Sequence, residues 1–332
     1  MNALAVNVRV ATGTATVEPD WDGIVETIHN AVGSAPVFLA GSRATGAWDT
    51  ESDYDIVVVL PLTRIPRAIG RLATVRTTLE HTLGAPVSLN PLPAFQLWRS
   101  ATNLYVWKLH TEGTVLFAPE DFPVERPAPF QLTATSAYSY LMTAAFVLLD
   151  AAGAPEPADA WPADVVTRGV RKALLHIVQL RLLKQGDYAT TLAGAMERSQ
   201  DPGIAALLSE STNPRAWFSI RNLLLSEIAA VRPEAGVLHA IMRNTQYASL
   251  SRIRGQNRVA AVARTSSFEY ELGDAAVRLL QAVNDNGTVS ESELADAARQ
   301  LPAWLHAPHR DWPGLRGMLH REWASAHALA GL

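Results

Sequence analysis

Two aspartates, Asp53 and Asp55, stand one residue apart where a β-branched apolar run begins. Side chains at alternating positions of a strand point to the same side, and two carboxylates held that close repel each other unless a positive charge lies between them. Carboxylate oxygens are the hard ligands that Mg²⁺ takes in proteins. The spacing therefore leaves two alternatives: the carboxylates lie in open water, or they hold a cation.

The turn Gly41-Ser42, just upstream, ends another apolar run. Glycine lets the backbone approach a ligand closely because it has no side chain. Ser42 offers a hydroxyl and a backbone N–H at a predicted helix start, where partial positive charge suits a phosphate. Each feature alone also fits an ordinary turn or a solvated strand entrance. Together they predict a site for a metal-bound triphosphate.

The elements around these residues alternate between strand and helix patterns. Hydrophobic periodicity predicts strands at 36–41, 55–60, 85–92 and 114–119 and helices at 20–33, 63–83 and 94–111. A stretch with four prolines in twelve residues, 119–130, is typical of a linker. The patterns beyond it predict helices at 131–151, 162–185, 203–210, 214–230, 268–283, 290–301 and 313–330. We therefore expect an α/β (α+β) domain with a mixed sheet, residues 1–125, followed by an α-helical domain, residues 126–332.

Composition limits the classes of function. The 332 residues carry a formal charge of -4, which argues against broad coating of nucleic acid. There is no cysteine, so disulfides and thiolate metal sites are excluded and a reducing cytoplasm is the simplest location. Without a secretion signal or an apolar run long enough to cross a bilayer, we expect a cytoplasmic protein with no membrane contact. The sequence does not determine the oligomeric state.

The segment GSRATG, followed by SDYDIVVVL, resembles the signature of the DNA-polymerase-β-like nucleotidyltransferase superfamily, closest to its minimal and aminoglycoside-modifying members. The resemblance implies that Gly41, Ser42 and Arg43 bind the triphosphate and that Asp53 and Asp55 are catalytic and bind two Mg²⁺ ions. It also implies in-line attack of an acceptor hydroxyl on the α-phosphorus, with pyrophosphate leaving.

The sequence departs from this pattern on the third strand, where the family places a further carboxylate. Ser88 and Asn90 stand there instead, and neither can act as an anionic ligand. Three alternatives remain: the acid comes from Glu112, Asp121, Asp49 or Glu51; the base comes from the helical domain or the acceptor; or the domain binds a nucleotide without transferring it.

Five arginines between 243 and 264 form a basic segment that could bind a triphosphate, an anionic acceptor or a nucleic-acid backbone, or could be a solvated face. We expect Mg²⁺-dependent transfer of a nucleoside monophosphate, with AMP favoured, from a nucleoside triphosphate to a hydroxyl of a small molecule. The alternative is a catalytically degraded fold that acts as a nucleotide-binding, regulatory or toxin–antitoxin module.

Overall fold

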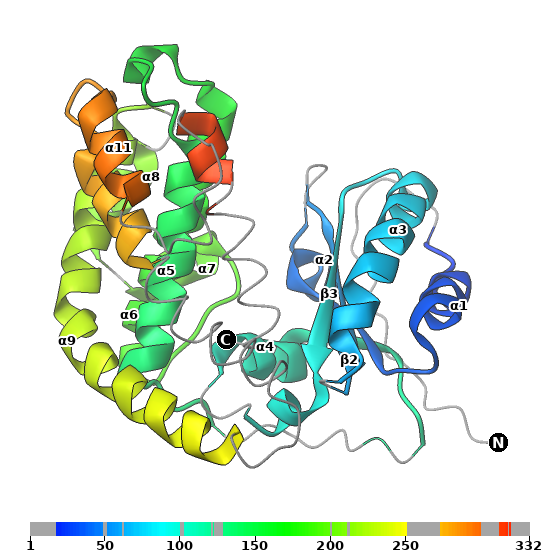
Figure 1. The fold of residues 1–332 in the computed structure, drawn as a ribbon. Helices are drawn as coiled ribbons and strands as arrows, with labels where there is room; N and C mark the ends of the chain where they lie inside the picture. The colour runs from blue at the N-terminus through cyan, green and yellow to red at the C-terminus, as the bar shows by residue number, and fades with distance from the viewer. Residues whose placement is uncertain are drawn as a thin grey trace. The chain divides into compact units, whose positions relative to one another are not determined.

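The computed structural model describes residues 18–48, 52–61, 63–99, 103–120, 122, 129–199, 201–210, 213–250, 273–299, 312–317 and 319. The chain divides into two compact units, Met1–Phe130 and Gln131–Ala330. Figure 1 draws both units. The expected domain boundary at residues 125 and 126 lies outside the described residues.

The first unit contains a four-stranded sheet with the strand order β3-β2-β1-β4. Its strands are β1 (Val37–Ala40), β2 (Tyr54–Leu60), β3 (Val87–Pro93) and β4 (Thr114–Phe117). Strand β1 runs antiparallel to both β2 and β4, whereas β3 runs parallel to β2. The sheet is therefore mixed, which confirms the fold expected from the sequence.

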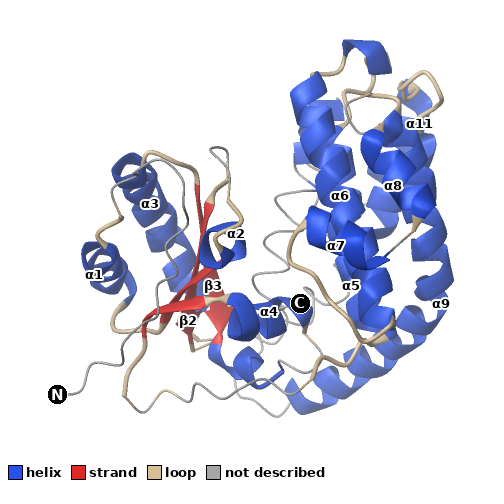
Figure 2. Cartoon of the chain, turned by 180° about the vertical axis from the view of Figure 1, so that it is seen from behind, coloured by secondary structure: helices blue, strands red, loops and turns tan. Residues whose placement is uncertain are grey.

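The two faces of this sheet differ in what covers them. By alternation, Ile56, Val58 and Leu60 share one face, and all three are fully buried. Helices α1 (Trp21–Val32) and α3 (Ile65–Leu83) lie on one side of the sheet, and α4 (Leu104–Glu112) lies on the other (Figures 1 and 2). The face toward α4 presents Val57 and Val59 of β2, which pack against Val106 and Leu109.

A short helix and a 3₁₀ turn complete the first unit. Helix α2 (Gly41–Thr45) follows β1 directly, and the 3₁₀ segment η1 (Ala94–Arg99) follows β3. The prediction of one helix over 94–111 was wrong, because the chain breaks into η1 and α4. Asn103 begins α4 as its N-cap, with a side chain that accepts a hydrogen bond from Val106 N at 3.2 Å.

The second unit is helical, as expected. Its described helical elements are α5 (Ala134–Ala151), η2 (Ala158–Ala160), α6 (Ala163–Lys184), α7 (Leu192–Ser199), α8 (Pro202–Ser209), α9 (Ala216–Leu250), a helix at 273–282, α11 (Glu291–Arg299) and a helical turn at 312–317. Helix α7 is absent from the prediction. Helix α9 continues well beyond the predicted end at residue 230, through Pro233. Its earlier turns are anchored by buried side chains such as Trp217 and Leu224.

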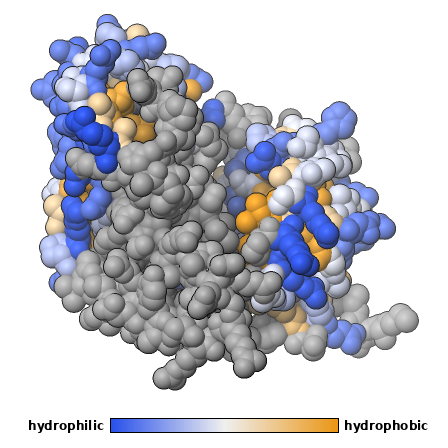
Figure 3. All heavy atoms as spheres, viewed as in Figure 1, coloured by the Kyte–Doolittle hydropathy of each residue, from blue (hydrophilic) through white to orange (hydrophobic). Residues whose placement is uncertain are grey.

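In the view of Figure 3, the described surface is mainly hydrophilic, with smaller hydrophobic areas. Ile69 and Val165 are the large hydrophobic side chains that are most exposed among the described residues, at 43% and 42%. Within the same part of the chain, every helix is too short or too polar to cross a bilayer.

Candidate active site

The predicted residues meet where β1 ends and β2 and β3 begin. Ala40, the last residue of β1, is the register partner of Asp55, near the start of β2. Asp55 is also the register partner of Ser88 on the parallel strand β3. Side chains of paired residues lie on the same face of a sheet. The carboxylate and the hydroxyl therefore share the face that α4 covers.

The Asp55 carboxylate packs against the backbone of Gly41. Its φ is +68°, a left-handed conformation that side chains disfavour. A Cβ atom on Gly41 would lie 3.2 Å from Asp55 Cγ and would overlap Asp55 Oδ2. Two features therefore require a glycine at position 41: the left-handed backbone, and the Asp55 carboxylate that occupies the space of a Cβ atom. Ser42, the next residue, is half-buried in α2.

Asp53 precedes β2, and its carboxylate is hydrogen-bonded to a residue of the neighbouring strand β3. The Ser88 hydroxyl donates a hydrogen bond to Asp53 Oδ2 at 3.0 Å. Ser88 thus lies where the sequence analysis places it, beside the two aspartates, but it acts as a neutral donor. It fixes the orientation of one carboxylate and adds no negative charge.

Arg43 contacts Ser52 and Tyr54, the residues on either side of Asp53. Its Nε and Nη2 atoms donate to the Ser52 carbonyl at 3.2 and 2.8 Å, and its Nη1 donates to the Tyr54 hydroxyl at 3.2 Å. The guanidinium also lies over the rings of Trp48 and Tyr54, at 4.5 and 4.0 Å from their centroids. This planar cation therefore makes both cation–π contacts and hydrogen bonds within the protein. Its binding to phosphate stays a prediction.

Tyr105, at the start of α4, is a further polar group on this face and was not among the predicted site residues. Burial raises the pKa of its phenol, the negative charge of Asp55 raises it further, and the Asn90 amide acts in the opposite direction. The Asn90 side chain is therefore a polar neighbour of the phenol. The signal in the sequence was Asn103, whose capping preference places Tyr105 in the first turn of a new helix.

The comparison with known proteins agrees with this geometry. Residues 23–102 match the family model described as nucleotidyltransferase domain, a segment that contains β1, α2, β2 and β3. The chain carries a nucleotidyltransferase domain. This finding confirms the resemblance to the polymerase-β-like superfamily, and the helical unit follows the nucleotidyltransferase domain in the chain. No curated protein matches the sequence significantly.

The source of a third acid in the nucleotidyltransferase domain stays open. Asp49, Glu51 and Asp121 lie outside the described residues. Glu112 ends α4, roughly 10 Å along the helix axis from Tyr105 at 1.5 Å per residue. In the described ranges, no three His, Asp or Glu side chains form a group that could hold a metal ion. The side chains of the basic segment 243–264 are also outside the description.

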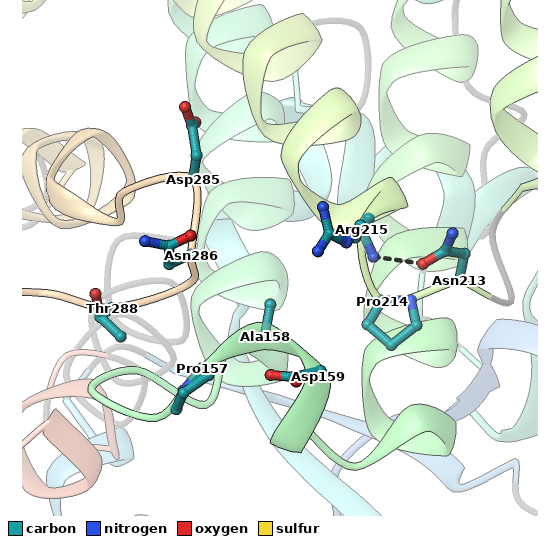
Figure 4. A pocket seen from close by; sticks show the side chains of 9 residues that line it. All are labelled: Pro157, Ala158, Asp159, Asn213, Pro214, Arg215, Asp285, Asn286 and Thr288. Atoms are coloured by element: carbon teal, nitrogen blue, oxygen red, sulfur yellow. Dashed lines mark hydrogen bonds between the residues drawn. The ribbon is translucent and has the colours of Figure 1, made fainter.

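The helical unit has a pocket of its own, with a volume of about 690 Å³. Figure 4 shows the loops that line it: Pro157, Ala158, Asp159, Asn213, Pro214, Arg215, Asp285, Asn286 and Thr288. Asn213 Oδ1 accepts a hydrogen bond from the Arg215 backbone N–H at 2.9 Å. The lining carries charges of both signs, and no residue predicted for the nucleotide site belongs to it.

Proposed function

We propose that the protein transfers a nucleoside monophosphate from a nucleoside triphosphate to a hydroxyl of a small molecule, in a reaction that depends on Mg²⁺. AMP is the group that we propose, on the resemblance to small-molecule nucleotidyltransferases. The observation that carries the proposal is the position of the Asp55 carboxylate on the backbone of Gly41, at the edge where Asp53 also stands. This edge lies within the segment that matches the nucleotidyltransferase family.

The donor set suits Mg²⁺. This ion is commonly bound by one or two carboxylates, with substrate phosphates and water completing its octahedral shell. Asp53 and Asp55 supply two carboxylates, and the hydroxyl of Ser88 orients the first of them. A second ion, which the resemblance implies, would have to draw its remaining ligands mainly from the triphosphate. When bound, Mg²⁺ would neutralise charge on the phosphates and polarise the α-phosphorus.

The protein's own groups would then position the reactants. The backbone at Gly41 lets a phosphate approach the carboxylates closely, and Ser42 can donate to a phosphate oxygen. The acceptor oxygen forms a bond to the α-phosphorus, while the bond between that phosphorus and the bridging oxygen breaks and pyrophosphate leaves. The hydroxyl proton passes to water or to a base. Ser88 does not supply that base, because its hydroxyl donates to Asp53.

The test is pyrophosphate release from each of the four nucleoside triphosphates, with Mg²⁺ and a panel of small hydroxyl compounds that includes aminoglycosides. We expect release with ATP and one class of acceptor. Asp53→Asn keeps the shape of the side chain but removes its charge, and should abolish release. Asp22→Asn on α1 is the matched control, since it removes an acid from the same unit outside the site. Equal release by the wild type and Asp53→Asn would refute the proposal.

A second candidate is a nucleotide-binding or regulatory module, including a toxin–antitoxin component. It is favoured by one observation: Ser88 is the register partner of Asp55, at the position where the resemblance leads us to expect an acid. This candidate predicts Mg²⁺-dependent nucleotide binding without pyrophosphate release by the wild type. The same assay, combined with calorimetry, therefore separates the two functions.

A further inference from the structure

The Tyr105 hydroxyl is a buried donor that has no hydrogen-bond partner in the structure. Leaving such a group unsatisfied destabilises a fold, because its hydrogen bonds to water are lost and not replaced. A phenylalanine would fill the same space without that cost. The packing of α4 therefore does not account for the hydroxyl.

The sheet register places this hydroxyl beside the candidate metal ligands. Asp55 and Val57 of β2 pair with Ser88 and Asn90 of β3, so all four side chains share one face. Tyr105 packs on the hydrophobic cluster of that same face, which includes Val57. Helix α4, which carries Tyr105, also packs against β1 and α2, the elements that bring Gly41 to the site.

The neighbours of the phenol divide its hydrogen-bonding capacity. Asn90 is an amide and can donate to the phenol oxygen, whereas Asp55 is an anion and can only accept. Of these two neighbours, Asp55 is the one that can only accept the phenolic proton, and its negative charge raises the pKa of the phenol. The phenol oxygen has almost no exposed surface, so it is not placed to contact a substrate directly.

We propose that Tyr105 is a positioning residue for Asp55: its hydroxyl donates to the Asp55 carboxylate when that carboxylate binds Mg²⁺, and thereby holds it in the orientation that the ion requires. Outer partners of this kind fix ligand orientation, and their loss weakens metal affinity 10- to 100-fold. This inference rests on the proposed function, since it needs a cation at Asp53 and Asp55. Each of the two described acids would then have its own hydrogen-bond donor: Ser88 for Asp53 and Tyr105 for Asp55.

The test is calorimetric titration of Mg²⁺ into the full-length protein with ATP, for the wild type, Tyr105→Phe and Tyr138→Phe. Tyr138 is a buried tyrosine of the helical unit and serves as the matched control. Tyr105→Phe should need 10- to 100-fold more Mg²⁺ for the same ATP binding, and Tyr138→Phe should match the wild type. The metal-free Tyr105→Phe variant should melt at the same temperature as the wild type or higher.

The outcomes separate the inference from the function on which it rests. If Tyr105→Phe needs no more Mg²⁺ than the wild type, the inference is overturned and the proposed function stands. If it weakens Mg²⁺ binding only together with a lower melting temperature, Tyr105 is a structural residue and the inference is also overturned. If the wild type itself shows no Mg²⁺-dependent ATP binding, the proposed function fails and the inference fails with it.

Discussion

Replacement of Gly41 by alanine tests whether the turn and the Asp55 carboxylate form one unit. Two separate costs follow from the structure. The backbone at Gly41 has a φ of +68°, and holding a residue with a Cβ atom in that region costs about 1–2 kcal/mol. The new Cβ would also lie 3.2 Å from Asp55 Cγ and overlap Oδ2. To regain van der Waals contact the carboxylate must move by roughly 1 Å, and a misplacement of this size can reduce catalytic rates about 100-fold.

Gly46 offers a matched control for this change. Its φ is +74°, so Gly46→Ala carries a similar backbone cost, but a Cβ atom there would meet nothing within 4 Å. We expect both variants to lose about 1–2 kcal/mol of unfolding free energy in urea. Only Gly41→Ala should lose about 100-fold in pyrophosphate release and in Mg²⁺-dependent ATP affinity. If the two variants retain the same activity and affinity, the close approach of Gly41 to Asp55 has no functional role and the reasoning is refuted.

Three further predictions concern stability. Gln96 is fully buried, and neither its side-chain oxygen nor its side-chain nitrogen has a hydrogen-bond partner in the structure. Gln96→Met should therefore raise the free energy of unfolding by about 1–3 kcal/mol. A lower free energy of unfolding in urea titration would contradict this. Burial lowers the pKa of His110 and outweighs the hydrogen bond that its ring N–H donates to the Leu97 carbonyl. The contribution of His110 to stability is therefore complete above about pH 6.5 and is lost as the pH falls through the folded pKa. His110→Gln should therefore flatten the loss of stability between pH 7.5 and 5.5, and an unchanged slope would exclude His110 as its cause. Arg43→Lys keeps the charge but loses the planar fork, and should lower the free energy of unfolding by about 1 kcal/mol; an unchanged value would mean that charge alone matters.

The strands and the Asp-x-Asp pair could be predicted from the sequence because the signals are local. A continuous β-branched run indicates the buried strand β2, and Asp53 and Asp55 stand at its start. The break between η1 and α4 was missed because the apolar pattern runs on across it, although Asn103 carried the capping signal. Helix α9 was predicted to end at residue 230, but it continues through Pro233, a residue type that normally interrupts a helix.

The details of the site depend on pairing between distant segments, which no local pattern contains. The opposition of Ala40 to Asp55 follows from the antiparallel register of β1 and β2. The position of Tyr105 follows from the packing of α4 on one face of the sheet. The sequence suggested that Arg43 binds phosphate, but its contacts with Ser52 and Tyr54 join residues that are 9 and 11 positions apart, and no local pattern predicts them.

The most direct test of the central claim is calorimetric titration of nucleoside triphosphates into the wild type and Asp53→Asn, each with Mg²⁺ and with EDTA. If the paired carboxylates hold a cation against a triphosphate, the wild type should bind at least one nucleotide much more tightly with Mg²⁺ than with EDTA, and Asp53→Asn should lose that difference. Nucleotide binding that is indifferent to Mg²⁺, or that survives equally in Asp53→Asn, would contradict the claim.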